Sequence, residues 1–280
     1  MASKSAAGPS LITAIARHYD SLALLYRAFW GEHIHHGLWL ADDDSPQIAQ
    51  QNLIEHLAER AGIRHGERVL DVGCGYGASA RWLSSRFGCP VTGVTISAAQ
   101  ARLARRYNLR RRGASSIDIV RADAAILPIR DATFDLVWVV ECSEHLPAKR
   151  RFVENVARLL RPGGRFALCT WLRSDGVPAD DPLVQDVCDA FLCPSLASAG
   201  DYRLWSEEAG LDLRSTEELT SQVRRTWDVL SDRVDRPWLA PLKWVLLDRA
   251  GRRFVDGFPT IAKAYDSGAM SYGLLVAGKF

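Results

Sequence analysis

The stretch VLDVGCGYGASARWL, residues 69–83, decides the fold. An apolar run ends in Asp71, and Gly73, Gly75 and Gly77 follow directly before residues with helical spacing. Glycine lets the backbone turn sharply and approach a ligand, because no Cβ stands in the way. We therefore expect a buried strand that ends in a glycine turn, with a ligand held against the N-terminus of the following helix.

A dinucleotide is one ligand that such a turn can hold, and its fingerprint is G-x-G-x-x-G. This chain has G-x-G-x-G directly after an aspartate. A carboxylate beside the loop suits a cationic amino-acid group better than a pyrophosphate. An NAD-dependent dehydrogenase stays a remote alternative that this spacing disfavours, and binding of a nicotinamide dinucleotide would test it.

Working outward, residues 67–171 alternate short apolar runs with helical patterns, which is typical of a parallel sheet with crossover helices. Helices are predicted near 77–87, 97–112 and 148–160. The predicted strands are RVLDV (68–72), PVTGVTI (90–96), SIDIVRA (116–122), FDLVWVV (134–140) and GRFALCTW (164–171). The pattern predicts a doubly wound α/β core.

Two further regions flank this core. Residues 11–30 and 46–61 have helical periodicity, and a Trp-, Leu- and Arg-rich stretch from 172 to 265 precedes the strand-like end MSYGLLVAGKF. We expect a helical lid at 1–62, a ligand-binding core at 63–172, a substrate-covering helical insertion at 173–265 with a strand near 211–219, and a final core strand at 266–280. An apolar cover over one end of the sheet is also suggested by six of the nine tryptophans: Trp30, Trp39, Trp205, Trp227, Trp238 and Trp244.

Composition excludes several classes of protein. Among 280 residues, 35 basic and 33 acidic side chains leave a formal charge of +2, which gives no reason to expect nucleic acid. Six cysteines form no C-x-x-C pair, and no apolar run has the length of a membrane span or the form of a signal peptide. We expect a cytoplasmic protein that binds a small molecule, and leave a homo-oligomer open.

A histidine-rich stretch, WGEHIHHGLWL at residues 30–40, raises the question of a metal. His33, His35 and His36 are two, one and three residues apart, so no single helix face gathers them as the H-E-x-x-H pattern would. We predict no metal site. A metal-dependent hydrolase stays an alternative that elemental analysis of the purified protein would exclude.

Three motifs in order carry a resemblance to a known family. D-V-G-C-G-x-G resembles motif I of the class I S-adenosylmethionine-dependent methyltransferases, and LLRPGGRFAL (159–168) resembles their turn before strand five. In ADAAILPIRDATFDLVW (122–138), the resemblance places Asp123 and Ala124 at the adenine. It implies a Rossmann-like fold with a seven-stranded, mostly parallel sheet and helices on both faces. It also implies S-adenosyl-L-methionine as cofactor and S-adenosyl-L-homocysteine as product.

The same resemblance implies the other residues around the cofactor. Asp71, Gly73 and Gly75 belong to motif I. Strand two departs from the usual pattern, because GVTISAAQ has Thr95 and Ile96 where most of these enzymes have an acid for the ribose, with Gln100 assisting. Tyr19 lies where the family has a tyrosine near the sulfonium, and a helix-packing tyrosine is the alternative reading.

A closer resemblance is to the γ-tocopherol methyltransferase group and bacterial natural-product C-methyltransferases. Its residues are WGEHIHHGLW (30–39), ECSEHLPAK (141–149) and CDAFLCPSLASAGDYRLWSEEAGL (188–211). It implies that the first stretch is part of a lid, with His35, His36 and Trp39 in the acceptor pocket.

The second stretch follows strand four, where α/β enzymes collect reactive groups. His145 is the candidate base, with Glu144 adjacent, and Glu141 is expected to contact donor or acceptor. A structural histidine and a solvated acid are the alternatives.

The expected function is methyl transfer to a lipophilic aromatic or terpenoid small molecule, with C-methylation in natural product biosynthesis. Carbon is favoured because the resemblance points to ring C-methylation. N- or O-methylation of a small natural product is the alternative. A noncatalytic S-adenosylmethionine-binding protein is a remote one, which would bind the cofactor without turnover.

Overall fold

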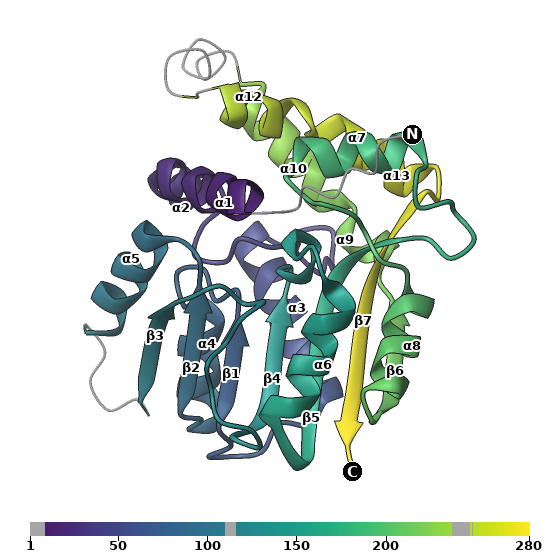
Figure 1. Cartoon of the computed structure of the whole chain (residues 1–280). Helices are drawn as coiled ribbons and strands as arrows, with labels where there is room; N and C mark the ends of the chain where they lie inside the picture. Colours follow the sequence, from purple (N-terminus) through teal and green to yellow (C-terminus); the bar gives the residue numbers. More distant parts are fainter. Residues whose placement is uncertain (1–8, 110–115, 237–246, 248) are drawn as a thin grey trace.

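The computed structural model describes residues 9–109, 116–236, 247 and 249–280. Its centre is a seven-stranded sheet with the strand order β3-β2-β1-β4-β5-β7-β6 (Figure 1). The strands are β1 (Val69–Val72), β2 (Val91–Thr95), β3 (Ile117–Arg121), β4 (Phe134–Val140), β5 (Leu160–Arg173), β6 (Leu211–Glu218) and β7 (Met270–Lys279).

The first five strands pair in parallel, whereas β7 runs antiparallel to both β5 and β6. This confirms the predicted seven-stranded, mostly parallel sheet. The longest strand, β5, starts at Leu160 instead of residue 164, because Leu160 pairs with Phe134 across an irregularity in the register. This pairing with β4 extends β5 through residues 162–164 (PGG), where the local sequence alone predicts a loop.

Alternation along β4 builds a core on each face of the sheet. Leu136 and Trp138 are fully buried in the cluster that reaches α3, α4 and the lid helices. Val137 and Val139 are equally buried on the opposite side, in a cluster with α6 and α8. Because both faces are covered, β4 is apolar at nearly every position.

Helices occupy both faces and one end of the sheet (Figure 1). The structure has α1 (Pro9–Ser21), α2 (Ala23–Phe29), α3 (Pro46–Ala61), α4 (Ala78–Phe87), α5 (Ala98–Asn108), the 3₁₀ turn η1 (Ser143–His145), α6 (Lys149–Leu159), α7 (Pro182–Ala190), α8 (Ala199–Glu208), α9 (Thr220–Val223), α10 (Arg225–Val234), α12 (Arg249–Asp256) and α13 (Phe258–Asp266). Of the helix predicted at 97–112, residues 110–112 lie outside the described residues.

The cover over the carboxyl end of the sheet has two parts. Helices α1 and α2 come from the N-terminal region, and α7, α10, α12 and α13 come from the insertion (Figure 1). Helix α3 instead packs against β5 and β7, so the expected lid at 1–62 is divided between the end and a face of the sheet.

The tryptophans divide in the same way. Trp30 and Trp227 are buried in the cluster that includes the lid helices, whereas Trp205 packs beside Tyr202 on the α8 side of the core. Trp238 and Trp244 lie outside the described residues. In the described part of the chain, no helix combines the length and apolar character needed to cross a membrane.

Candidate active site

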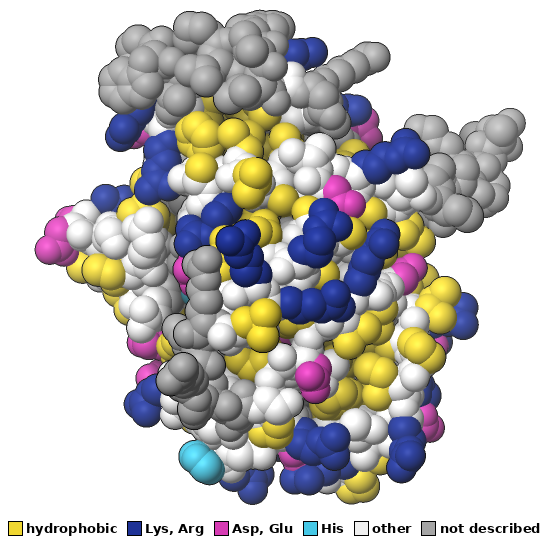
Figure 2. Space-filling view, turned by 90° about the vertical axis from the view of Figure 1, so that its left-hand side faces the viewer, with side chains coloured by type: hydrophobic (Ala, Val, Ile, Leu, Met, Phe, Trp, Pro, Cys, Tyr) yellow, Lys and Arg dark blue, Asp and Glu magenta, His cyan; other side chains and the backbone are white. Residues whose placement is uncertain are grey.

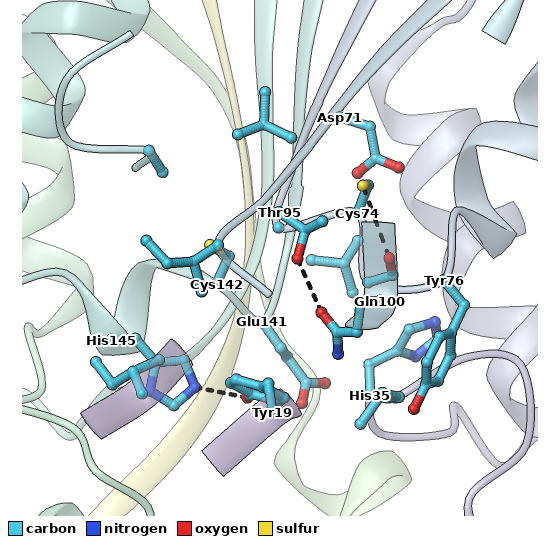
Figure 3. A pocket seen from close by; sticks show the side chains of 18 of the residues that line it. Tyr19, His35, Asp71, Cys74, Tyr76, Thr95, Gln100, Glu141, Cys142 and His145 are labelled. Atoms are coloured by element: carbon cyan, nitrogen blue, oxygen red, sulfur yellow. Dashed lines mark hydrogen bonds between the residues drawn. The ribbon is translucent and has the colours of Figure 1, made fainter. Parts of the chain in front are cut away.

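The carboxyl ends of β1, β2 and β4 meet at one cavity, which we call the main cavity (Figure 3). Gly73 has φ +81°, and a Cβ there would lie 2.6 Å from Cys142 Sγ. Only glycine fits this turn without displacing the β4 end. The main cavity is lined by all nine residues that the sequence predicts for the cofactor: Tyr19, Asp71, Gly73, Gly75, Thr95, Ile96, Gln100, Asp123 and Ala124.

Asp71 is the buried acid at the end of β1. It is 3% exposed, and its Oδ2 has no hydrogen-bond partner in the structure. Burial raises its pKa to about 7, against a hydrogen bond from the Ala80 backbone that lowers it. A buried, unpartnered carboxylate oxygen in the cavity wall fits a ligand that brings a hydrogen-bond donor, such as an ammonium group.

At the end of β2, Thr95 Oγ1 donates to Gln100 Oε1 at 2.8 Å (Figure 3). This bond uses the amide oxygen, so the amide nitrogen of Gln100 is available to a ligand.

Asp20, which the sequence analysis did not single out, connects the lid to the segment that follows β2. Its Oδ1 accepts from Ser97 Oγ at 2.6 Å and from Ala99 N at 2.8 Å, and thereby joins α1 to the start of α5. The sequence signal that could have identified Asp20 is its position directly after Tyr19.

His145 lies in the short turn after β4, and its two ring nitrogens have different partners. Nδ1 donates to Leu192 O at 3.3 Å, which leaves Nε2 to accept from the Tyr19 hydroxyl at 2.9 Å (Figure 3). Burial lowers the pKa of His145 to about 4; the charge of Lys149 acts in the same direction and the Leu192 bond opposes both. The imidazole is therefore neutral near pH 7, and its Nε2 lone pair is directed at the Tyr19 hydroxyl.

Lys149 holds the turn that carries His145. Its Nζ donates to Glu144 O at 3.2 Å, to Leu146 O at 2.8 Å and to Ser195 O at 2.8 Å. The first two carbonyls flank His145, and the third belongs to the loop that accepts from its Nδ1. The ammonium group therefore clamps both segments that orient the imidazole, a role the sequence motif did not indicate.

Glu144 points to the side of His145 away from the main cavity. Its Oε1 accepts from Thr170 Oγ1 at 2.8 Å and from Trp171 N at 2.7 Å, whereas Oε2 is buried without a hydrogen-bond partner. Burial, and then the charge of Glu141, raise the pKa of Glu144 to about 7. This carboxyl group can therefore gain or lose a proton near neutral pH.

Glu141 is an anchor for the lid, and both of its carboxylate oxygens accept hydrogen bonds. It accepts from His36 N at 2.7 Å, His36 Nδ1 at 3.0 Å, Tyr272 OH at 2.8 Å and Trp171 Nε1 at 2.9 Å. Burial alone would raise the pKa of Glu141, but its electrostatic and hydrogen-bonding interactions with His36 bring it to about 2. A carboxylate this acidic is a poor proton acceptor near pH 7.

The histidine-rich stretch is divided between packing and the main cavity, which Glu32, His33, Ile34 and His35 line. His35 lines the main cavity, but His36 is fully buried against Glu141 and also accepts from Trp227 Nε1 at 2.7 Å. Trp39 is not part of the main-cavity wall, and its Nε1 donates to Thr226 Oγ1 at 3.1 Å. His36 and Trp39 are thus outside the cavity walls where the resemblance had placed them.

These contacts also bear on the metal question. His35 Nδ1 donates to His36 O at 2.7 Å, and His35 Nε2 lies 3.1 Å from His33 Nδ1. Since a carbonyl can only accept, His35 Nε2 is the acceptor of the second bond, and its lone pair is used. Within the described residues, no group of three or more His, Cys, Asp or Glu side chains has the arrangement of a metal site.

Next to Tyr19 and His145 lies a second space that we call the aromatic chamber. It shares Tyr19, Ile34, Glu141 and His145 with the main cavity. The rest of its wall consists of Glu144 and a set of mostly aromatic rings: His18, Tyr26, Trp30, Trp171, Phe191, Trp227 and Phe254. The hydroxyl–imidazole pair thus lies at the junction of the site at the glycine turn and a chamber walled mostly by aromatic rings.

Comparison with known proteins gives the same assignment. The family model described as "Methyltransferase domain" matches residues 70–168. Tocopherol O-methyltransferase of Arabidopsis thaliana is 31% identical over 95% of this chain and 81% of its own length. 27-O-demethylrifamycin SV methyltransferase of Amycolatopsis mediterranei is 34% identical over 79% of this chain and 82% of its own.

Among solved structures, geranyl diphosphate C-methyltransferase of Streptomyces coelicolor, determined with S-adenosyl-L-homocysteine, superposes with a TM-score of 0.76. It is 22% identical, and the match covers 98% of this chain and 99% of that one. This likeness shows the shared fold. With the glycine turn, the cavity at the carboxyl ends of the strands and relatives above 30% identity, the chain belongs to the class I S-adenosylmethionine-dependent methyltransferases.

Proposed function

We propose that the enzyme methylates a lipophilic aromatic or terpenoid small molecule in natural product biosynthesis, with carbon as the favoured acceptor atom. One observation carries this proposal: a neutral imidazole, His145, sits with the Tyr19 hydroxyl between the cofactor loop and a chamber walled by aromatic rings. An acceptor that leaves its reactive end at this junction meets the Tyr19–His145 pair beside a set of aromatic rings.

On the cofactor side, S-adenosylmethionine supplies a methyl group bound to a positively charged sulfur. Asp71 is proposed to receive the amino group, since its Oδ2 is buried and unpartnered. The turn at Gly73 and Gly75 gives the backbone close access. Thr95, Ile96 and Gln100 are proposed for the ribose, and Asp123 and Ala124 for the adenine. Asp123 is held by its own turn, in which Oδ1 accepts from Ala125 N at 2.9 Å.

On the acceptor side, Tyr19 and His145 form a path for a proton. The Tyr19 oxygen faces the junction while its hydrogen is given to His145 Nε2. An acceptor proton can pass to the Tyr19 oxygen as the Tyr19 proton moves to Nε2. General base catalysis of this kind contributes about a hundredfold to ten-thousandfold in rate. Glu144, with a pKa of about 7, is proposed as a second group that can take the proton from the chamber side.

The acceptor atom has two candidates. Carbon transfer requires an electron-rich ring or alkene and then loss of a proton, which a neutral base beside an apolar chamber supports. Oxygen transfer to a hydroxyl needs the same base. It is favoured by the names of two relatives, tocopherol O-methyltransferase and 27-O-demethylrifamycin SV methyltransferase.

The test is incubation of the purified protein with S-adenosylmethionine labelled with carbon-13 at the methyl group. An organic extract of the source organism and defined phenols and prenols serve as acceptors. Mass spectrometry detects the product, and the carbon shift of its methyl group separates transfer to carbon from transfer to oxygen. Label on a polar acceptor, with none on any lipophilic one, would contradict the proposed acceptor class.

A further inference from the structure

A third space lies beside the aromatic chamber, between α2, α10 and α12, and we call it the apolar cavity. Its volume is about 190 Å³, and its described walls are almost wholly carbon. Leu25 and Phe29 of α2 line it, with Leu230 and Val234 of α10 and Val255 of α12. Arg233 also lines the cavity, and its guanidinium donates a hydrogen bond to Phe29 O.

The aromatic chamber and the apolar cavity share three side chains: Tyr26, Trp30 and Phe254. These rings pack edge to face, with 5.3 Å between the centroids of Tyr26 and Phe254 and 6.0 Å between those of Tyr26 and Trp30. Tyr26 and Trp30 are 5% and 7% exposed, whereas Phe254 is only half-buried. The partition is thus one ring thick, and Phe254 is its least confined member.

The volumes of the aromatic chamber and the apolar cavity limit the size of the group that each can hold. The chamber holds about 40 Å³, about a fifth of the volume of the apolar cavity. An engineered apolar cavity of about 150 Å³ takes up benzene, so the apolar cavity, at about 190 Å³, has room for a unit of about six to eight carbons. A lipophilic acceptor cannot fit its bulk into the chamber, but the apolar cavity can hold it.

We infer that the apolar cavity is the subsite for the hydrocarbon part of the acceptor, and that Phe254 sets the length and width of chain that enters from the chamber. The inference rests on the proposed function for its acceptor class. The reactive end then lies at Tyr19 and His145, with the chain passing the Phe254 ring. Figure 2 shows hydrophobic side chains reaching the surface at the height of α2 and α12, above a group of basic side chains.

Binding of 4-n-alkylphenols, with chains from none to twelve carbons, tests this without turnover. Calorimetry with S-adenosyl-L-homocysteine present measures the affinity. Each methylene buried in an apolar site raises affinity about fourfold. We expect this increment for about the first six carbons and a plateau once the cavity is filled. An affinity independent of chain length would overturn the subsite.

Two variants locate the effect. Leu25→Trp fills the apolar cavity and should end the chain-length dependence, whereas Leu24→Trp, on the same helix at a residue 72% exposed, should preserve it. Phe254→Ala removes the partition ring and should move the plateau to longer chains. Equal behaviour of the Leu24 and Leu25 variants, or an unmoved plateau in Phe254→Ala, would place the chain elsewhere.

Methylation of the same phenols separates the two proposals. Chain-length-dependent binding with no methylated product supports the subsite and contradicts the phenolic acceptor. Methylation with no chain-length dependence supports the acceptor class and overturns the subsite.

Discussion

Replacing Lys149 with methionine tests the most specific positioning contact at the site. The side chain is buried, and its Nζ donates to three backbone carbonyls, those of Glu144, Leu146 and Ser195. Methionine fills similar space but cannot donate. The change therefore leaves three backbone carbonyls without this donor, two of them buried, on the two segments that hold His145.

The expected loss of stability follows from these contacts. A hydrogen bond to a charged group contributes about 1.5–3 kcal/mol, and burying an ammonium costs part of that gain. Burial indeed lowers the pKa of Lys149, so the ammonium is in an unfavourable environment. We expect Lys149→Met to lower the free energy of unfolding by about 2–4 kcal/mol, measured by urea denaturation.

A second readout distinguishes positioning of His145 from general support of the fold. The positive charge of Lys149 lowers the pKa of His145, so its removal should raise that pKa above about 4. NMR titration of the His145 ring should show this rise, together with a turnover about tenfold or more lower. Lys149→Arg keeps the charge and should restore part of the turnover.

Lys279→Met is the matched control. Its Nζ also donates to two backbone carbonyls, Ala157 O at 2.7 Å and Leu160 O at 2.8 Å, but at the opposite end of the sheet. It should lower stability and leave the His145 pKa and turnover unchanged. The positioning role would be refuted if Lys149→Met kept the wild-type His145 pKa, or if both variants lost turnover alike.

Three further predictions concern the turn and the base. His145→Ala should lower turnover about a hundredfold or more, while the cofactor affinity measured by calorimetry stays within about twofold. Tyr19→Phe should lower turnover about tenfold. Full turnover in either variant would remove that residue from the proton path. Turnover should rise with pH through about 7 as the Glu144 carboxyl ionises, and Glu144→Gln should flatten that rise; an unchanged profile would assign it to another group. Gly73→Ala should cost more than about 2 kcal/mol in urea denaturation, whereas Gly75→Ala, with open space around it, should cost about 1; equal costs would contradict the close approach to β4.

The residues that the sequence analysis assigns to the cofactor line one cavity, and those of the core belong to continuous segments. Asp71 to Gly75 form the end of β1 and its turn, Thr95 and Ile96 lie at the end of β2, and Asp123 and Ala124 follow β3. Parallel strands bring their carboxyl ends to one edge, so order along the chain becomes proximity in space. That rule does not extend to side chains whose partners come from an insertion.

The assignments of His36 and Trp39 show where this reasoning stopped. The resemblance put His36 and Trp39 in the acceptor pocket, yet His36 is bonded to Glu141 and Trp227, and Trp39 to Thr226. Those partners lie more than a hundred residues away in the chain, so no local pattern contains them. Glu141 became an ionised anchor for the same reason.

The sequence by itself determined the α/β class, the glycine turn and the family, because strand periodicity and motif spacing are properties of short segments. Tertiary structure alone decided the protonation of the acids and of His145, the clamp at Lys149, and the partition at Phe254. Each of these depends on desolvation or on contact between distant segments. Both arise only when the chain packs, since a side chain loses water and gains partners according to what surrounds it in three dimensions.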